Sequence, residues 1–324
     1  MKNSLLALAK IGVTVVIIVF LLSRVDLAAM GRHLAAANPV FLLLALALYL
    51  FAIFLGAVKW QILTRAQGLP SSLGDLLAYS FVGLFFGNLL PSNVGGDVVR
   101  AYGLVRVSGR AEAAAISVLV DRLMGLATYV GAAMIMAALA AVVVTRAELE
   151  QIEAAAAFAA VLFIVAMALL FSRRVSRRVK WVFDYAPLAR VRPIAERIYR
   201  ALQVYRHSYL ALALNLLLSG FIVVVTTIVW YTVARGLGVD VSPFYFFLFN
   251  PLIAFVTLLP ISLNGLGPKE ATAVFFFGLI GVPSEVALAM SLVFHLLIVL
   301  TSLPGGVLWW REKRLAPPRV VVTE

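Results

Sequence analysis

The feature that most constrains this chain is a series of apolar runs, each long enough to cross a membrane. A membrane-spanning helix needs roughly 20 consecutive apolar residues. In this chain 63% of the residues are hydrophobic and only 13% are charged, against about 25% charged residues in a typical soluble domain. Burial in a water-soluble core does not account for that difference. The sequence therefore predicts an all-α polytopic membrane protein, built as a single transmembrane domain over residues 1–324.

Six of the apolar runs are uninterrupted and predict full spans. Their approximate bounds are 5–22, 40–58, 113–143, 154–171, 209–234 and 285–310. The first run follows Lys2 and Lys10, as the apolar region of a signal peptide would. No small-x-small cleavage pattern follows it, so we interpret this run as a retained helix.

Two further apolar stretches end in turns that contain Pro, Asn and Gly. One runs over residues 73–90 and is followed by a helical segment at 94–107; the other runs over 241–259 and is followed by 268–281. Irregular backbone is tolerated at membrane depth only where it is buried in protein or faces water. We interpret both pairs as re-entrant helical hairpins that line a cavity. The alternative is that the turns are ordinary loops outside the membrane.

The two turns resemble each other, which indicates an internal repeat. Both contain Leu-Leu-Pro, followed by Asn, Gly and a charged residue, and each pair of half-helices lies between two full spans. The predicted repeats cover about 40–143 and 209–310. Counting membrane crossings gives them opposite orientations. Inverted repeats with broken helices are typical of transporters, whose substrate sites lie between the repeats near the midplane.

Positive charge is concentrated in one short segment, which sets the predicted topology. Ten Lys and Arg residues but only two acidic residues lie between Arg173 and Arg206. By the positive-inside rule the segment 172–208 and the basic C-terminus face the cytoplasm, in a bacterial-type inner membrane. These cytoplasmic basic residues account for much of the net charge of +12, so we do not expect nucleic-acid binding. The chain has no cysteine and its three histidines have no metal-site spacing, so we expect no metal and no cofactor.

Asp121 and Arg122 lie inside a predicted span, where a charge costs about 2.5–3.5 kcal/mol on insertion scales. Such residues usually face a cavity or one another. We expect Asp121 to pair with a cation such as Arg100 or Lys269, leaving the guanidinium of Arg122 to bind a lipid phosphate. A static structural pair is the alternative.

The residues around the two turns complete the candidate substrate site. Helix N-termini offer free N–H groups to an anion such as phosphate, and glycine permits close approach of the backbone. The acidic and basic residues that follow the turns serve either substrate binding or helix capping. These candidates are Asn93, Gly95, Gly96, Asp97 and Arg100 at the first turn, and Asn264, Gly265, Gly267, Lys269 and Glu270 at the second. His295, in the last span, is either a proton relay or a hydrogen-bonded core histidine.

Three stretches together resemble one family. They run from Asn88 to Arg100 (Asn-Leu-Leu-Pro-Ser-Asn-Val-Gly-Gly-Asp-Val-Val-Arg), from Val120 to Gly125 (Val-Asp-Arg-Leu-Met-Gly) and from Pro260 to Glu270 (Pro-Ile-Ser-Leu-Asn-Gly-Leu-Gly-Pro-Lys-Glu). The chain resembles, over nearly its whole length, the flippase-like family related to the transmembrane region of lysyl-phosphatidylglycerol synthase. The resemblance implies lipid handling at Asp97, Arg100, Asp121, Arg122, Gly265, Gly267 and Glu270. This chain departs from the family at Lys269, where Arg is common, and at Asn264, where Gly is usual.

The leading hypothesis is therefore a lipid translocator (a flippase) that moves an anionic or modified phospholipid or a polyprenyl-phosphate-linked lipid. No P-loop pattern is present, so nucleotide hydrolysis by this chain is not expected to drive it. The alternatives are a membrane enzyme acting on lipid-linked substrates and an accessory subunit of a lipid synthase or glycosyltransferase.

Overall fold

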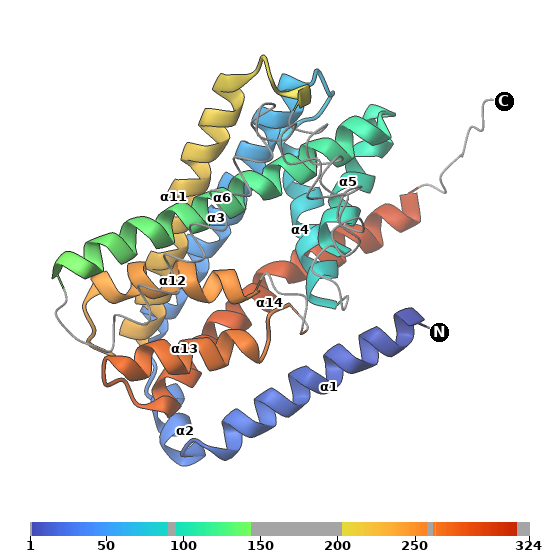
Figure 1. Ribbon diagram of the computed structural model, residues 1–324. Coiled ribbons are helices and arrows are strands. Elements are labelled where there is room, and N and C mark those ends of the chain that lie inside the picture. Colours follow the sequence, from blue (N-terminus) through green and yellow to red (C-terminus); the bar gives the residue numbers. More distant parts are fainter. Residues whose placement is uncertain (1, 90–94, 144–202, 258–261, 263, 316–324) are drawn as a thin grey trace, which may run out of the picture.

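The computed structural model describes residues 2–89, 95–143, 203–257, 262 and 264–315, and every regular element in that part of the chain is a helix. At the N-terminus, α1 (Lys2–Ser23) and α2 (Leu27–Ala35) meet at an angle of 91°. The rest forms two groups of four helices (Figure 1). The first group is α3 (Pro39–Ala66), α4 (Leu73–Leu89), α5 (Gly95–Ser108) and α6 (Ala111–Val143); the second is α11 (Tyr209–Gly236), α12 (Pro243–Thr257), α13 (Pro268–Leu279) and α14 (Ser284–Leu315).

Four of the described helices are long and apolar enough to cross a membrane, namely α3, α6, α11 and α14. The count is five if the bent pair of α1 and α2 forms one span. The prediction of a helical membrane protein is thus confirmed. The predicted span at 154–171 and most of the basic segment 172–208 lie outside the described residues, so six spans stays a prediction.

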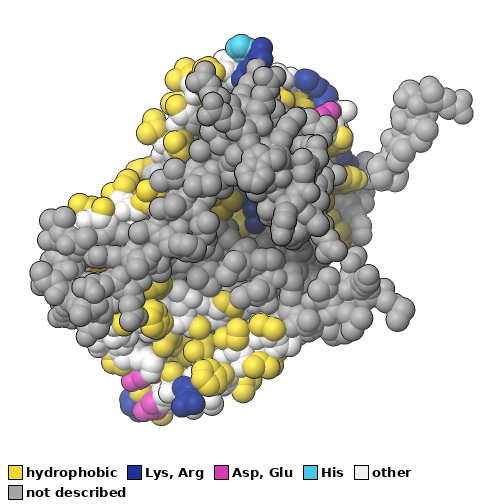
Figure 2. Space-filling view, in the orientation of Figure 1, with side chains coloured by type: hydrophobic (Ala, Val, Ile, Leu, Met, Phe, Trp, Pro, Cys, Tyr) yellow, Lys and Arg dark blue, Asp and Glu magenta, His cyan; other side chains and the backbone are white. Residues whose placement is uncertain are grey.

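The outward surface of the described helices is apolar, as lipid contact requires. Val16 of α1, Leu43 of α3 and Leu217 of α11 are each more than 60% exposed. On the face drawn in Figure 2, charged side chains gather at the upper and lower ends and apolar ones lie between them. This distribution matches a hydrocarbon layer flanked by two aqueous surfaces.

Inside the second group of helices, aromatic rings form the largest core. Trp230 of α11 stacks on Phe294 of α14 with ring centroids 4.5 Å apart, and Phe249 of α12 meets Phe277 of α13 edge-on. Phe249 and Phe277 are almost fully buried. Aromatic pairs of this kind stabilise a core beyond the area they bury.

The two groups repeat the same order of elements: a long helix, two short helices and a second long helix. The first helices also end alike. Leu69 N–H bonds to Thr64 C=O (3.0 Å) after α3, and Val239 N–H bonds to Ala234 C=O (2.9 Å) after α11. The residue before each donor is a glycine with positive φ, as a Schellman cap requires.

The groups interlock rather than stand apart. The two first helices, α3 and α11, pack along each other, while α14 packs on α4 of the other group and α6 packs on α12. The contact between α14 and α4 depends on Gly305, where a Cβ atom would lie 2.0 Å from the carbonyl oxygen of Phe81. Because the obstacle is backbone, only glycine permits this approach.

We predict that Gly305→Ala destabilises the protein by about 1–3 kcal/mol, as overpacking does. This loss exceeds the gain of about 1 kcal/mol that Ala brings to a helix interior. The matched control is Gly278→Ala in α13, where a Cβ atom meets nothing within 4 Å. Thermal unfolding in detergent measures both. An apparent Tm of Gly305→Ala at or above that of the wild type would show that the helices do not pack this closely.

Candidate functional site

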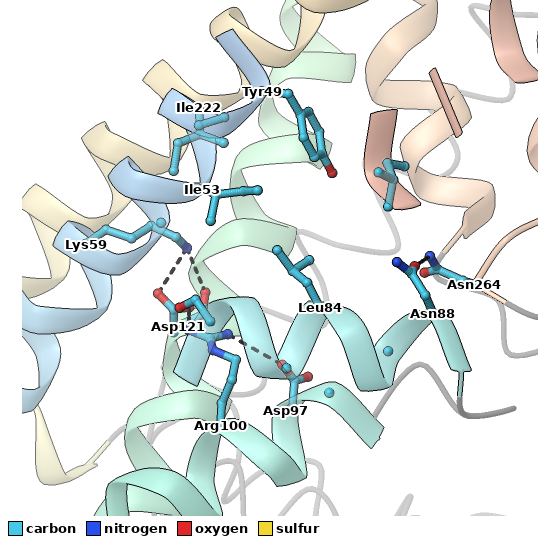
Figure 3. Close-up of a pocket in the computed structure, with 17 residues that line it drawn as sticks. Tyr49, Ile53, Lys59, Leu84, Asn88, Asp97, Arg100, Asp121, Ile222 and Asn264 are labelled. Carbon is cyan, nitrogen blue, oxygen red and sulfur yellow. Dashed lines mark hydrogen bonds and ion pairs between the residues drawn. The ribbon is translucent and has the colours of Figure 1, made fainter. Parts of the chain in front are cut away.

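A cavity of about 430 Å³ lies where the two groups meet. Its walls come from α3, α4, α5, α6, α11 and α14 and from the turn before α13 (Figure 3). One part is apolar, with Ile53, Leu84 and Ile222. The other part is strongly polar and charged; its side chains are Lys59, Ser80, Asn88, Asp97, Arg100, Asp121 and Asn264.

Asp121 of α6 is the centre of the charged part, with a side chain only 6% exposed. Its carboxylate lies 3.0 Å from Lys59 Nζ of α3 and 3.2 Å from an Arg100 terminal nitrogen of α5. Asn215 of α11 donates its side-chain N–H to the same carboxylate at 3.1 Å. Burial of a carboxylate is tolerated only with such partners, so Asp121 ties four helices together.

Arg100 is held in place on several sides. Its guanidinium lies 4.2 Å from the centre of the Trp60 ring, a cation–π contact, and 3.5 Å from Asp97. The Trp60 indole N–H donates to Ser117 Oγ at 3.1 Å and is thereby fixed. Gly83 makes room, because a Cβ atom there would lie 2.6 Å from Arg100 Cγ. Arg100 Nε is buried and has no hydrogen-bond partner among the described residues.

Asp97 lies between two arginines, Arg100 and Arg122. The prediction that Arg122 is left to bind lipid phosphate therefore needs a correction, because Arg122 forms an ion pair with Asp97. With a side chain 31% exposed, Arg122 is still the most accessible member of the network. Of the charged residues that line the cavity, two are cations, Lys59 and Arg100, and two are carboxylates, Asp97 and Asp121.

The second turn reaches the cavity through Asn264, which has a positive φ of 45° and lines the wall. Its side-chain amide donates to the side-chain oxygen of Asn88 at the end of α4. Asn88 in turn donates to Ser302 Oγ of α14 at 2.9 Å. These hydrogen bonds join the end of α4 to α14 and to the turn before α13 at the cavity edge; Asn88 and Asn264 lie next to each other at the right of Figure 3.

Lys269 and Glu270 form a separate buried cluster next to this turn, with side chains 4% and 0% exposed. Lys269 Nζ lies 3.2 Å from Glu270 Oε1 and 3.2 Å from His295 Nδ1. Glu270 also accepts hydrogen bonds from Ser291 Oγ (3.2 Å) and from the backbone N–H of Gly267 (2.6 Å). His295 is half-buried and hydrogen-bonded to Lys269; its proton-relay role stays a hypothesis.

The predicted site residues thus fall into several places. Gly96, Asp97, Arg100, Asp121 and Asn264 line the cavity, and Arg122 joins it through Asp97. Gly95 begins α5, while Gly265 and Gly267 have positive φ and shape the second turn. Lys269 and Glu270 lie in their own cluster and not in the cavity wall. Asn93 lies outside the described residues.

Asp121 pairs with Arg100 as expected, but its other cation is Lys59 and not Lys269. The sequence predicted a span that ends at residue 58, just before Lys59. In the structure α3 continues to Ala66, which leaves Lys59 inside the bundle with a side chain 11% exposed. Asn215 was also missed. Its position as a polar residue within an apolar span was the signal that marks such sites.

We predict that Asp121→Asn destabilises the protein by about 3–5 kcal/mol, because Lys59 and Arg100 would be left buried without their carboxylate. Adding Lys59→Met should restore part of the loss. The matched control is Asp240→Asn. Asp240 has a side chain that is 92% exposed and forms an ion pair with Arg235, so that this substitution should lower the stability by less than about 1 kcal/mol. Apparent Tm in detergent measures all three, and equal effects of Asp121→Asn and Asp240→Asn would contradict the central role of Asp121.

Comparison with known proteins agrees with the resemblance drawn from the motifs. The chain is 26% identical over 285 residues to a UPF0104 membrane protein of Methanothermobacter thermautotrophicus, with 82% of each chain covered. It is 21% identical over 337 aligned positions to a UPF0104 membrane protein of Pyrococcus horikoshii, covering 97% of this chain and 98% of that one. The model of the family described as lysylphosphatidylglycerol synthase TM region matches residues 7–305. This protein therefore belongs to the lysylphosphatidylglycerol synthase transmembrane-region family.

Proposed function

We propose that this protein translocates a lipid with an anionic, phosphate-containing headgroup from one leaflet of its membrane to the other. The observation that carries the proposal is the cavity between the two groups of helices, whose wall holds the buried Arg100 with an Nε that has no hydrogen-bond partner among the described residues. Charged residues within membrane bundles usually mark substrate pathways. Membership of a family named after a lipid synthase makes a lipid the expected substrate.

The size and lining of the cavity fit a headgroup rather than a whole lipid. About 430 Å³ is at the small end of ligand pockets and leaves no room for two acyl chains. The tails would stay in the bilayer beside the apolar helix surfaces. Ile53, Leu84 and Ile222 would meet the apolar part of the lipid next to the headgroup.

Arg100 is the residue that we assign to the phosphate. Its guanidinium is oriented by Trp60 and Asp97, and its planar fork suits two phosphate oxygens at once. In the empty site Asp97 and Asp121 neutralise the cations, so an entering phosphate would compete with these carboxylates. Such exchange keeps the charges paired throughout, which matters because an unpaired buried ion is strongly unfavourable.

We further propose that the two groups of helices are inverted repeats that rock about the cavity. The matching helix order, the equivalent Schellman caps and the crossed packing of α14 on α4 and α6 on α12 support this. Re-entrant insertion of α4–α5 and α12–α13 belongs to the same proposal. We also propose that the protein resides in the cytoplasmic membrane, with segment 172–208 and the C-terminus on the cytoplasmic side. It would cooperate there with a lipid synthase or a glycosyltransferase.

The test is leaflet exchange in liposomes of phosphatidylcholine that contain NBD-labelled phosphatidylglycerol, measured by dithionite quenching. We predict that Arg100→Gln lowers the exchange rate at least about tenfold, since a hydrogen bond to a charged group is worth about 1.5–3 kcal/mol. The matched control is Arg65→Gln near the end of α3, where the arginine is exposed and outside the cavity. It should exchange lipid at the wild-type rate.

Three outcomes separate the candidate functions. Exchange that prefers NBD-phosphatidylglycerol to NBD-phosphatidylcholine and falls in Arg100→Gln supports translocation. A change in lipid mass on incubation, read by mass spectrometry, would replace translocation with an enzyme activity. No exchange and no change in mass would favour the accessory role beside a lipid synthase or glycosyltransferase.

A further inference from the structure

The cluster of Lys269, Glu270 and His295 does not line the cavity, yet it places three titratable groups inside the bundle. Glu270 is fully buried and Lys269 is 3% exposed. The two oxygens of Glu270 already accept three hydrogen bonds, from Gly267, Ser291 and Lys269. Because Lys269 and Glu270 pair with each other, His295 is the member of the cluster whose charge can change by taking up a proton.

The hydrogen bonds define the resting charge of this cluster. Lys269 as an ammonium ion donates to Glu270 and to His295 Nδ1, so that nitrogen is an acceptor and the imidazole is neutral with its proton on Nε2. The three side chains then sum to zero charge. A proton that adds to Nδ1 forms an N–H bond there, turns the Lys269 ammonium toward Glu270 alone and raises the cluster to +1.

The neighbouring elements bring little else to balance that charge. In the described part of the chain, the charged groups that act on His295 are Lys269 and Glu270 of α13. The other helices packed on α14 bring uncharged or outward-facing groups, namely Tyr49 from α3, Trp230 from α11, Asn88 from α4 and Arg32 from α2. A second positive charge in this low-dielectric environment is therefore unfavourable unless a new negative charge lies nearby.

Two structural links connect the cluster to the cavity. Glu270 accepts the backbone N–H of Gly267, and the same turn places Asn264 in the cavity wall. The second link is α14 itself. Ile298, one helical turn after His295, also lines the cavity, and residues three apart lie on one face of a helix. A change at His295 therefore reaches the cavity through the turn and through one shared helix face.

We infer that His295, with Lys269 and Glu270, is a proton-binding site and that one proton moves together with each singly charged anionic headgroup. This inference rests on the proposed translocation and adds its driving force. The proton raises the cluster to +1 while the phosphate brings −1 to the cavity, so the loaded bundle has the same net charge as the empty one. Electroneutral loading avoids the cost of carrying a net charge through the membrane.

The experiment uses the full-length protein in phosphatidylcholine vesicles that contain NBD-labelled phosphatidylglycerol, with a pH gradient imposed across the membrane. If one proton moves with each lipid, a difference of one pH unit across the membrane gives about a tenfold ratio of labelled lipid between the two leaflets at equilibrium. We predict that the labelled lipid accumulates in the leaflet facing the alkaline side. A potassium diffusion potential alone should leave the distribution even, and nigericin should abolish the asymmetry.

His295→Gln should remove the asymmetry, because Gln binds no proton. His295→Asn, whose smaller amide also binds no proton, should likewise remove the asymmetry; it is the second variant and decides the matter if His295→Gln does not fold. His207→Gln, at an exposed histidine, is the matched control and should behave as the wild type.

Each outcome bears on a distinct claim. Exchange in the wild type that ends evenly despite the gradient would overturn the proton site and leave translocation standing. Full asymmetry in His295→Gln, or in His295→Asn where His295→Gln does not fold, would overturn the assignment to this cluster. No exchange under any condition would overturn translocation itself, and the proton coupling with it.

Discussion

The architecture depends on one buried carboxylate. Asp121 receives Lys59 from α3, Arg100 from α5 and Asn215 from α11 while belonging to α6. In a bundle surrounded by lipid there is little hydrophobic force between helices, so polar contacts and close packing must decide which helices meet. An ion cluster shared by four helices does this with high selectivity. A register shift in any one of them would leave a buried charge unpaired.

The cluster is possible only because backbones approach closely around it. A Cβ atom at Gly96 would lie 2.4 Å from the carbonyl oxygen of Gly83, and one at Gly83 would collide with the Arg100 side chain. The two glycines bring α4 and α5 together and turn Arg100 toward Asp121. Small residues at helix interfaces are a general device of membrane bundles; here they also create the polar wall of a cavity.

Sequence reasoning succeeded where local patterns carry the information and failed where partner choice depends on packing. Apolar run length predicted α3, α6, α11 and α14, and Pro, Asn and Gly predicted that α4 and α12 stop short. The pairing of Asp121 with Arg100 followed from the rarity of charges in spans. Lys59 was missed because hydropathy cannot place a helix end to within a turn. Lys269 was expected as a possible partner of Asp121 but pairs with Glu270. This could not be predicted without knowing which helices are in contact.

The two charged clusters differ in what their residues can do. The cavity wall holds two cations, Lys59 and Arg100, and two carboxylates, Asp97 and Asp121, and Arg100 keeps its charge at any physiological pH. The second cluster holds an imidazole against an ammonium, an arrangement whose charge changes with a single proton. In the mechanism that we propose, the fixed charges bind the phosphate, and the proton binds three residues from the cavity-lining Ile298. Recognition and energy input would then use different residues, so that neither task constrains the residues that serve the other.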